Sequence, residues 1–339
     1  MSLRFRSNPA VMALVLVAAL LEPARAEQVS LALDWQLQGP QAPFVAAKGM
    51  GAFREVNLDV RIDPGSGSQK TIERVVSGTY DLGYGDINSM IEYNVKHPGN
   101  PLVAVYVVLN TSPLAVFSLK RHGVSRPTDL QSVSIGAPAG DAARRLWPIF
   151  AQSVGFPAGD VRWVNVSPQL REPALVRGDV KAITGFHFTS WLNLTETLGV
   201  PESEIVAFRY SDHGLQLYGN AVMARADWLR SNAETVRRFL VGLTRGLKLA
   251  LREPAAAVAY VKSAEPLISV ATETRRLELA RTNMLNAEVH ANGLGAIDRA
   301  RMARAVDQLA EAFALPARPT VDQVFTDAYL PAAAARKVE

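Results

Sequence analysis

The stretch NLDVRIDPGSGSQKTIERVVSGTYDLGYGDIN, residues 57–88, decides the fold class. Residues 57–62 alternate apolar and polar side chains as a strand does, and residues 70–78 repeat apolar side chains at helical spacing until Gly78 ends the pattern. Residues 80–85 read as a second strand. A single helix between two strands makes the crossover of a parallel sheet, so the stretch predicts an α/β protein.

The loop inside this stretch ends in PGSGSQKT, residues 64–71, and has to be compared with the phosphate-binding loop G-x-x-x-x-G-K-[ST]. Pro64 and Gln69 stand where that loop needs glycines, and they lack, respectively, an N–H donor and a bare Cα. A nucleotide-binding loop is therefore excluded. The loop instead offers free backbone N–H groups at a helix start, with Ser66 or Ser68 as hydroxyl partners. This suits a polar or anionic group, or an ordinary helix cap.

The same alternation of strands and helices extends in both directions. Strands are expected at 29–35 and 101–110 around the opening stretch, and a second α/β unit follows at 132–208, before a helical tail from Ala226. We expect residues 27–112 to form the first part of lobe 1, residues 113–212 lobe 2, and residues 213–339 the return to lobe 1 with C-terminal helices. The predicted fold has two mainly parallel sheets, a ligand cleft between them and two crossing hinge strands.

The N-terminus predicts export. Two arginines, an apolar run at 10–21 that is too short to span a bilayer, and Ala-x-Ala at 24–26 are typical of a signal peptide cleaved near Ala26. A membrane anchor or a buried first helix is the alternative. The segment carries three arginines and one glutamate, so its removal lowers the formal charge from +4 to about +2 and leaves 313 of 339 residues.

Charge and cysteine content exclude several classes of protein. The mild charge without a Lys/Arg run gives no electrostatic basis for nucleic-acid binding. The chain has no cysteine, hence neither disulfides nor a lipid attachment site, and apolar residues at 48% supply a core for two lobes. We expect a monomer that is free in the periplasm.

The ends of the predicted strands indicate which residues are candidates for a ligand site. In open α/β sheets, ligands bind beyond the carboxyl ends of the strands. The loops that fit are 34–44, 63–69, 83–88, 136–143, 165–169 and 184–188. The predicted ligand-binding residues are Trp35, Gln36, Gln38, Ser66, Gly67, Ser68, Asp86, Ala139, Gly140, Asp141, Phe186 and His187.

Each candidate also has a structural interpretation. Trp35 is a stacking wall or a core residue, and Asp86 and Asp141 hold a ligand amine or cap their helices. Phe186 fits a lid over the ligand, whereas His187 fits a ligand contact and a structural role equally well. Two similar helix starts, one in each lobe, can face each other across the cleft, and this favours binding.

Catalytic and metal motifs are missing from the sequence. The five histidines form no H-x-x-x-H, and no G-x-S-x-G occurs. We therefore expect no metal, no cofactor, no catalytic residues and no enzymatic activity.

The order of these motifs resembles the periplasmic substrate-binding proteins of ABC importers for sulfonates, taurine, nitrate and thiamine-pyrimidine precursors. The matching positions are Ala46, Gly49, Gly51, Phe53, Asn57, Leu58, Val60, Val76, Gly78, Asp81, Gly83, Gly85 and Asp86, with weaker similarity at 128–140 and 218–232. The resemblance implies two lobes that close on a small ligand for an inner-membrane ABC permease. Its site positions correspond to Trp35, Ser66, Gly67, Ser68, Asp86, Gly140 and Asp141.

The resemblance leaves the ligand open. Thiamine-precursor binders carry D-W-x-P-N-x-x-H after the first strand, and this chain matches Asp34 and Trp35 but has Leu37, Gln38 and Gln41 at the last three positions. Sulfonate and nitrate binders use helix starts and often a cation, for which Arg144 and Arg145 are candidates. A related branch of fungal enzymes has a Cys-rich iron site, which this chain cannot form. A secreted enzyme on the same fold and a receptor for a membrane sensor kinase are the alternative functions.

Overall fold

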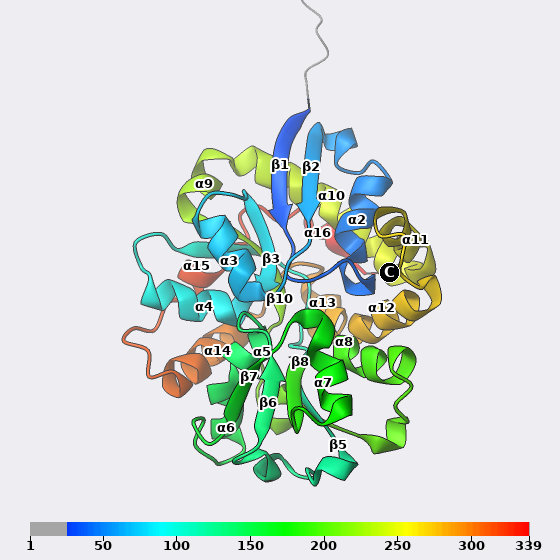
Figure 1. The fold of residues 1–339 in the computed structure, drawn as a ribbon. Helices are drawn as coiled ribbons and strands as arrows, with labels where there is room; N and C mark the ends of the chain where they lie inside the picture. Colours follow the sequence, from blue (N-terminus) through cyan, green and yellow to red (C-terminus); the bar gives the residue numbers. More distant parts are fainter. Residues whose placement is uncertain (1–25, 339) are drawn as a thin grey trace, which may run out of the picture.

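The computed structural model describes residues 26–338 (Figure 1). The predicted signal peptide, except for Ala26, lies outside the described residues. Within residues 26–338, none of the helices combines the length and the apolar character needed to cross a membrane.

Two five-stranded sheets form the two lobes (Figure 1). The first sheet has the order β2-β1-β3-β10-β4, and the second has the order β7-β6-β8-β5-β9. The strands of the first are β1 (Glu27–Ala32), β2 (Leu58–Asp63), β3 (Leu82–Asp86), β4 (Leu102–Val107) and β10 (Asn220–Arg225). Those of the second are β5 (Leu114–Leu119), β6 (Ser134–Ala137), β7 (Arg162–Asn165), β8 (Ala182–Phe186) and β9 (Ile205–Arg209).

Each sheet contains one antiparallel strand. β10 runs against both β3 and β4, and β5 runs against both β8 and β9, whereas the pairs formed by β1 and β6 are parallel. The predicted mainly parallel sheets are therefore confirmed, as mixed sheets with one reversed strand each.

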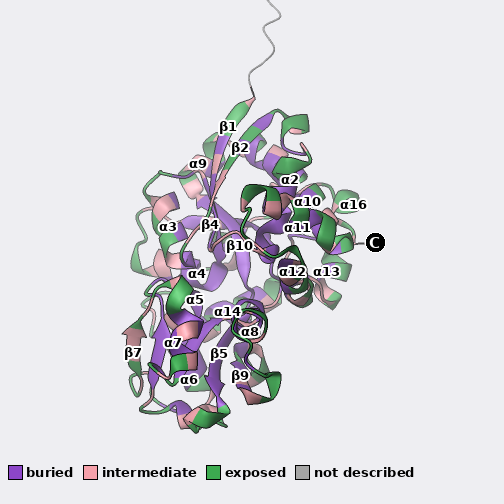
Figure 2. Ribbon diagram, turned by 45° about the vertical axis from the view of Figure 1, so that its right-hand side comes forward, coloured by how far each residue is buried: buried purple, intermediate pink, exposed green. Residues whose placement is uncertain are grey.

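Helices cover both sheets, and their exposed sides form most of the surface (Figure 2). The first part of lobe 1 contains α2 (Ala42–Gly49), α3 (Ser68–Val76) and α4 (Ile87–Lys96). Lobe 2 contains α5 (Ala142–Arg145), α6 (Trp147–Ser153), α7 (Arg171–Arg177) and α8 (His187–Leu192), which continues as a π-helix at Asn193–Thr197. After β10 follow α9 (Ala226–Ser231), α10 (Ala233–Arg252), α11 (Pro254–Ala264), α12 (Val270–Met284), α13 (Ala287–Asn292), α14 (Arg299–Ala312), α15 (Val321–Val324) and α16 (Ala333–Arg336).

The long helix α10 explains why the C-terminal part returns to lobe 1. It buries one face, including Phe239, Leu243 and Leu247, against α2. Gly246 of α10 permits this close approach. A Cβ at Gly246 would lie 2.1 Å from the Pro43 carbonyl oxygen, so even alanine would force the helices apart.

Two chain segments cross between the lobes, at 108–113 and 210–219, and they pair with each other. The Gly219 N–H donates to the Leu109 carbonyl at 2.8 Å, and the Ser112 N–H donates to the Leu217 carbonyl at 3.0 Å. The predicted double connection between the lobes is present, but neither segment is a β-strand there, and residues 210–213 form a 3-10 helix.

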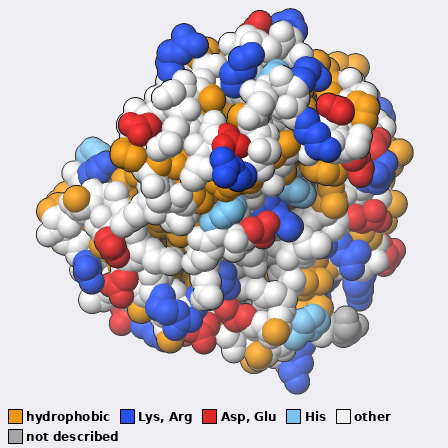
Figure 3. Space-filling view, turned by 90° about the horizontal axis from the view of Figure 1, so that it is seen from below, with side chains coloured by type: hydrophobic (Ala, Val, Ile, Leu, Met, Phe, Trp, Pro, Cys, Tyr) orange, Lys and Arg blue, Asp and Glu red, His pale blue; other side chains and the backbone are white. Residues whose placement is uncertain are grey.

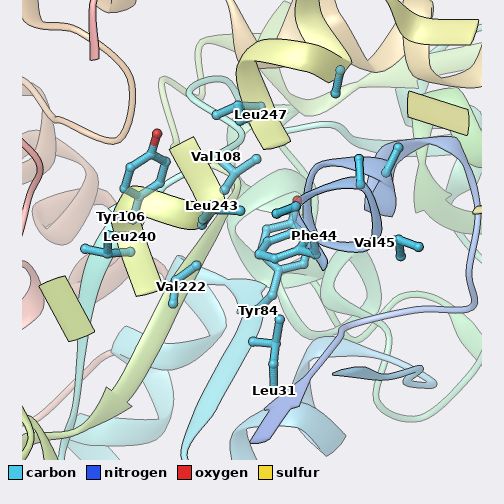
Figure 4. Packing of buried hydrophobic residues seen from close by; sticks show 14 of the residues in the cluster. Leu31, Phe44, Val45, Tyr84, Tyr106, Val108, Val222, Leu240, Leu243 and Leu247 are labelled. Carbon is cyan, nitrogen blue, oxygen red and sulfur yellow. The ribbon is translucent and has the colours of Figure 1, made fainter. Parts of the chain in front are cut away.

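The core of lobe 1 lies between its sheet and the helices α2 and α10 (Figure 4). The rings of Phe44 and Tyr84 pack at 4.6 Å between centroids, beside Leu31 and Val222 of the sheet. The core thus fixes β1 and β3, whose carboxyl ends carry part of the candidate site.

On the surface, acidic and basic side chains are interspersed over the face shown in Figure 3.

Candidate ligand-binding site

A cavity lies where the two lobes meet. It is lined by side chains from both lobes: Asp34, Trp35, Gln41, Gly67, Ser68, Asp141, Ala142, Arg171, Phe186, Phe188 and Thr189. Its volume is about 350 Å³, part of which is open to solvent. The lobes stand closed beside this cavity, where the Gln69 N–H of lobe 1 approaches the Gly140 carbonyl oxygen of lobe 2 at 3.4 Å.

The lobe 1 wall centres on a buried carboxylate at the end of the first strand segment. Asp34 is 3% exposed and accepts hydrogen bonds from Gln41 Nε2 at 3.2 Å and Asn220 Nδ2 at 2.8 Å. Burial raises the pKa of Asp34 to about 6, although both amide donors act in the opposite direction. The oxygens of both amides, Gln41 Oε1 and Asn220 Oδ1, are buried without a partner.

The starts of α3 and α5 contact each other across the boundary between the lobes. Gly67 precedes α3 with φ of 127°, and its N–H donates to the Asp34 carbonyl at 2.7 Å. A Cβ at Gly67 would lie 2.4 Å from the Gly140 carbonyl oxygen, so glycine is required both by conformation and by space. The Gln69 N–H approaches the same oxygen at 3.4 Å.

Asp141 contributes the second cavity carboxylate, from lobe 2. It caps α5 through the Arg144 N–H at 2.9 Å and accepts from Thr184 Oγ1 at 3.0 Å. Burial raises the pKa of Asp141, whereas the nearby Arg171 acts against this shift. Asp141 is thus a helix cap and a cavity residue at once.

Arg171 is the one cavity-lining cation, and other side chains already hold its charge. It is 1% exposed and donates to Glu172 Oε1 at 2.7 and 2.9 Å, to Ser190 Oγ at 3.1 Å and to Asp141 Oδ2 at 3.4 Å. Burial opposes its charge, but Glu172 and Asp141 outweigh burial and raise the pKa of Arg171. Its guanidinium carbon lies 5.2 Å from the centroid of the Trp35 ring.

Aromatic rings form the remaining walls. Trp35 comes from lobe 1, and Phe186 and Phe188 come from the start of α8 in lobe 2, with centroids 5.7 Å apart and planes at 77°. Aromatic side chains contributed by both lobes suit a flat ligand.

The charge of the site is acidic. The lining contains two carboxylates, Asp34 and Asp141, and one guanidinium, that of Arg171, which is bonded to Asp141 and to Glu172 behind the lining. Among residues 26–338, no group of three or more metal-binding side chains occurs. The arrangement favours a ligand that is cationic or rich in hydrogen-bond donors.

The structure brings some of the predicted residues together at the cavity and leaves others outside its lining. Trp35, Gly67, Ser68, Asp141 and Phe186 line it. The predicted residues outside the lining are Gln36, Gln38, Ser66, Asp86, Ala139, Gly140 and His187.

Their positions explain why they do not line the cavity. Ser66 and Ala139 are exposed, and Gly140 serves the contact with Gly67. Asp86 is fully buried as the cap of α4, where it accepts from the Ser89 N–H at 2.7 Å. Burial raises the pKa of Asp86 to about 6.

His187 is turned away from the cavity. Its ring packs between Phe117 and Trp191, with centroid distances of 5.9 and 5.6 Å. Burial lowers the pKa of His187 to about 4, so the ring is neutral at physiological pH. It borders a separate open groove beside α12.

Six cavity residues were not among the predicted ones: Asp34, Gln41, Ala142, Arg171, Phe188 and Thr189. Asp34, Gln41, Ala142 and Phe188 lie inside the loops selected from strand ends, and finer selection there could have found them. Arg171 begins α7, two residues past the loop 165–169, and no motif marks it. Arg144 and Arg145 have other partners, the Ala137 carbonyl and Glu92 respectively.

Comparison with known proteins identifies the family. A family model described as NMT1/THI5 like matches residues 39–257. A protein of Haemophilus influenzae named for thiamine biosynthesis is 26% identical over 197 residues, which cover 58% of this chain and only 61% of that protein. The 4-amino-5-hydroxymethyl-2-methylpyrimidine phosphate synthase of Aspergillus parasiticus is 23% identical over 262 residues, 74% of this chain and 75% of the enzyme.

Solved structures agree on the fold. The alkanesulfonate-binding protein SsuA of Xanthomonas axonopodis pv. citri, bound to MOPS, has a TM-score of 0.66 at 18% identity, covering 89% of this chain and 99% of its own. The periplasmic nitrate-binding protein NrtA of Synechocystis PCC 6803 has a TM-score of 0.66 at 14% identity, with 90% and 87% covered. A Candida albicans protein with the generic periplasmic binding protein fold reaches 0.69 at 16% identity, with 90% and 98% covered.

With its family model covering more than half of the sequence and its two lobes superposing on these structures, the chain belongs to the NMT1/THI5-like family and has the type II periplasmic binding protein fold.

Proposed function

We propose that this protein is an exported solute receptor, which closes its lobes on a small organic molecule and delivers it to an ABC permease of the inner membrane. The observation that carries the proposal is the interlobe cavity, which takes charged and aromatic side chains from both lobes, so that closing lobes would surround a ligand. The sulfonate- and nitrate-binding proteins of the same fold support this role. The predicted signal peptide supports a location in the periplasm.

The ligand we propose is an unphosphorylated aminopyrimidine. Trp35, Phe186 and Phe188 offer faces to a flat ring. Gln41 Oε1 is a buried acceptor without a donor, and Asp34 and Asp141 add carboxylate acceptors. An aromatic amine would donate to these groups. The Aspergillus relative is named for making the phosphate of such a pyrimidine, which supports this class of compound.

The charge of the cavity argues against an anion. A sulfonate, nitrate or phosphate would enter beside Asp34 and Asp141, and the only cationic side chain of the lining, Arg171, is already bonded to Glu172 and Asp141. An anion placed next to ionised carboxylates in a buried site is strongly unfavourable. We therefore expect the free pyrimidine alcohol to bind and its phosphate ester to be rejected.

The proposal includes that the ligand leaves unchanged. A receptor returns its ligand intact, whereas an enzyme like the named synthase would alter it. Delivery to a sensor kinase instead of a permease would use the same cavity, and the genes adjacent to this one distinguish the two.

The test is isothermal titration of the chain from residue 27 onward with 4-amino-5-hydroxymethyl-2-methylpyrimidine, its phosphate ester, taurine and nitrate. We expect the alcohol to bind at least a hundredfold more tightly than the three anions, and mass spectrometry to recover it unchanged. His187→Ala is the matched control, because its ring lies outside the cavity, and it should keep the wild-type affinity. Tighter binding of taurine or nitrate would refute the ligand, and conversion of the alcohol would refute the receptor.

A further inference from the structure

An ion pair with one buried partner crosses the boundary between the lobes on the side of α4 and α5 (Figure 1). Glu92 of α4 is 2% exposed, and Arg145 Nη2 of α5 donates to both of its oxygens, at 2.9 and 2.8 Å. Lys96 Nζ reaches the same carboxylate at 2.6 Å from within lobe 1. Neither Glu92 nor Arg145 lines the ligand cavity.

A second buried charge crosses on the opposite side, where α12 meets α8 (Figure 1). Arg276 of α12 is 1% exposed. It donates to three oxygens at the start of α8 and just beyond it: the carbonyls of Phe188 at 3.2 Å and Thr189 at 2.7 Å, and Asn193 Oδ1 at 3.0 Å.

Arg276 is itself anchored in lobe 1. Its Nε donates to Glu273 Oε2 at 2.9 Å, and the same oxygen accepts from the Gly39 N–H at 2.7 Å, next to the loop that carries Trp35 and Gln41. Because Phe188 and Thr189 line the cavity, Arg276 connects both of its walls without facing a ligand.

Apolar contacts between the lobes add to these polar ones. One continuous core cluster joins Met90 and Ile91 of α4 to Leu146 and Phe150 of lobe 2, together with Val306 of α14. Separating the lobes at this seam would expose apolar area that a ligand plays no part in burying.

We propose that the closed arrangement is the resting state of the protein, held without ligand by the pair Glu92–Arg145 on one side of the cleft and by Arg276 on the other. Charge-assisted hydrogen bonds to buried groups contribute net stability. Arg276 makes them to three oxygens of lobe 2. Arg145 makes two to Glu92 through Nη2, although its Nε is buried without a partner. The ligand then enters during brief openings, and these three residues set how often the cavity opens. Arg276 is in addition a positioning residue for the α8 wall.

The test measures the distance between the lobes in the ligand-free protein. The chain contains no cysteine, so Thr79→Cys in lobe 1 and Gln131→Cys in lobe 2 give two unique, exposed labelling sites for spin labels. Double electron–electron resonance on this protein should show one short-distance population. Arg145→Gln and Glu92→Gln should each raise the ratio of open to closed molecules at least tenfold, which corresponds to about 1.4 kcal/mol.

Arg276→Gln should have the same effect, and combining it with Arg145→Gln should leave most molecules open. Arg177→Gln is the control, because its pair with Asp179 lies on the surface within lobe 2, and it should not change the distances. If Arg276→Gln lowers the thermal midpoint, the two variants of the Glu92–Arg145 pair decide the question alone.

Two results would overturn the proposal: an open wild-type protein without ligand, or unchanged distances in the variants of both Glu92 and Arg145. The proposal builds on the receptor function, but the measurement needs no ligand. If the proposed ligand is wrong, the distances between the lobes should still be as predicted. If the proposal on Glu92, Arg145 and Arg276 is wrong, the titrations with ligand should still be as predicted.

Discussion

Replacing Asp34 with asparagine should make the protein more stable at neutral pH and weaken its binding of ligand. Burial raises the pKa of Asp34 from 3.8 to about 6, a shift of about 2 units. Each unit corresponds to about 1.4 kcal/mol, so the buried, ionised carboxylate costs up to about 3 kcal/mol of folding free energy.

The sign of the pH dependence follows from the raised pKa. The neutral carboxyl group favours the folded state, fully so below pH about 4, and this contribution is lost as the pH rises through about 6. Asparagine stays neutral throughout, so its advantage grows as the pH rises from about 4 to about 6 and is complete above that. The asparagine side chain can also be satisfied by hydrogen bonds. Gln41 and Asn220 each have a buried amide oxygen without a partner, so if one of these amides rotates by half a turn, its oxygen accepts the new N–H of the asparagine.

The assay is urea denaturation, followed by tryptophan fluorescence, of wild type and Asp34→Asn at pH 4.5 and 7.5. We expect the variant to gain about 1 kcal/mol at pH 4.5 and about 3 kcal/mol at pH 7.5, because the pKa shift of Asp34 from 3.8 to about 6 takes effect mainly between these two pH values. Asp86, whose pKa is raised to about 6 by burial, keeps its own pH dependence in both proteins. A variant that is less stable by the same amount at both pH values would refute the reasoning, because it would mean that Asp34 is stabilising in its ionised form.

Three further substitutions separate binding from folding. Trp35→Ala should weaken ligand binding at least tenfold in titration calorimetry with a nearly unchanged thermal midpoint, since the ring is half-buried at the cavity; a large fall in the midpoint would mean that it is core. Asp141→Asn should weaken binding, whereas Asp86→Asn should not, because only Asp141 lines the cavity; equal affinities would reduce both to helix caps. Arg171→Met should cost about 3–5 kcal/mol in urea denaturation, because Glu172 and Asp141 then lose their buried partner, and a loss below about 1 kcal/mol would contradict this.

The fold was largely predictable from local patterns. Residues 57–88 contain a complete strand–helix–strand unit, and the structure has β2, α3 and β3 there. The position of β10 was not predictable, because it inserts between β3 and β4 although more than a hundred residues separate it from both. Such pairing depends on long-range packing, which leaves no local pattern.

The site was predictable only in part, and the sequence 186–188 shows why. Phe186 is the last residue of β8, and His187 and Phe188 follow it directly, so the strand-end rule selects all three equally. Phe186 and Phe188 line the cavity while His187 turns to the opposite side, a difference set by the backbone at the start of α8. Arg171 escaped prediction for a related reason, since its partners Asp141 and Ser190 lie 30 and 19 residues away.

The central claim is that the interlobe cavity binds a flat, donor-rich heterocycle. A crystal structure of the protein with 4-amino-5-hydroxymethyl-2-methylpyrimidine tests it most directly. The account predicts the ring beside Trp35 and Phe186, with its amino group bonded to Gln41 Oε1 or to one of the two carboxylates, Asp34 and Asp141. An empty cavity at saturating ligand, or a ligand held elsewhere on the protein, would contradict it.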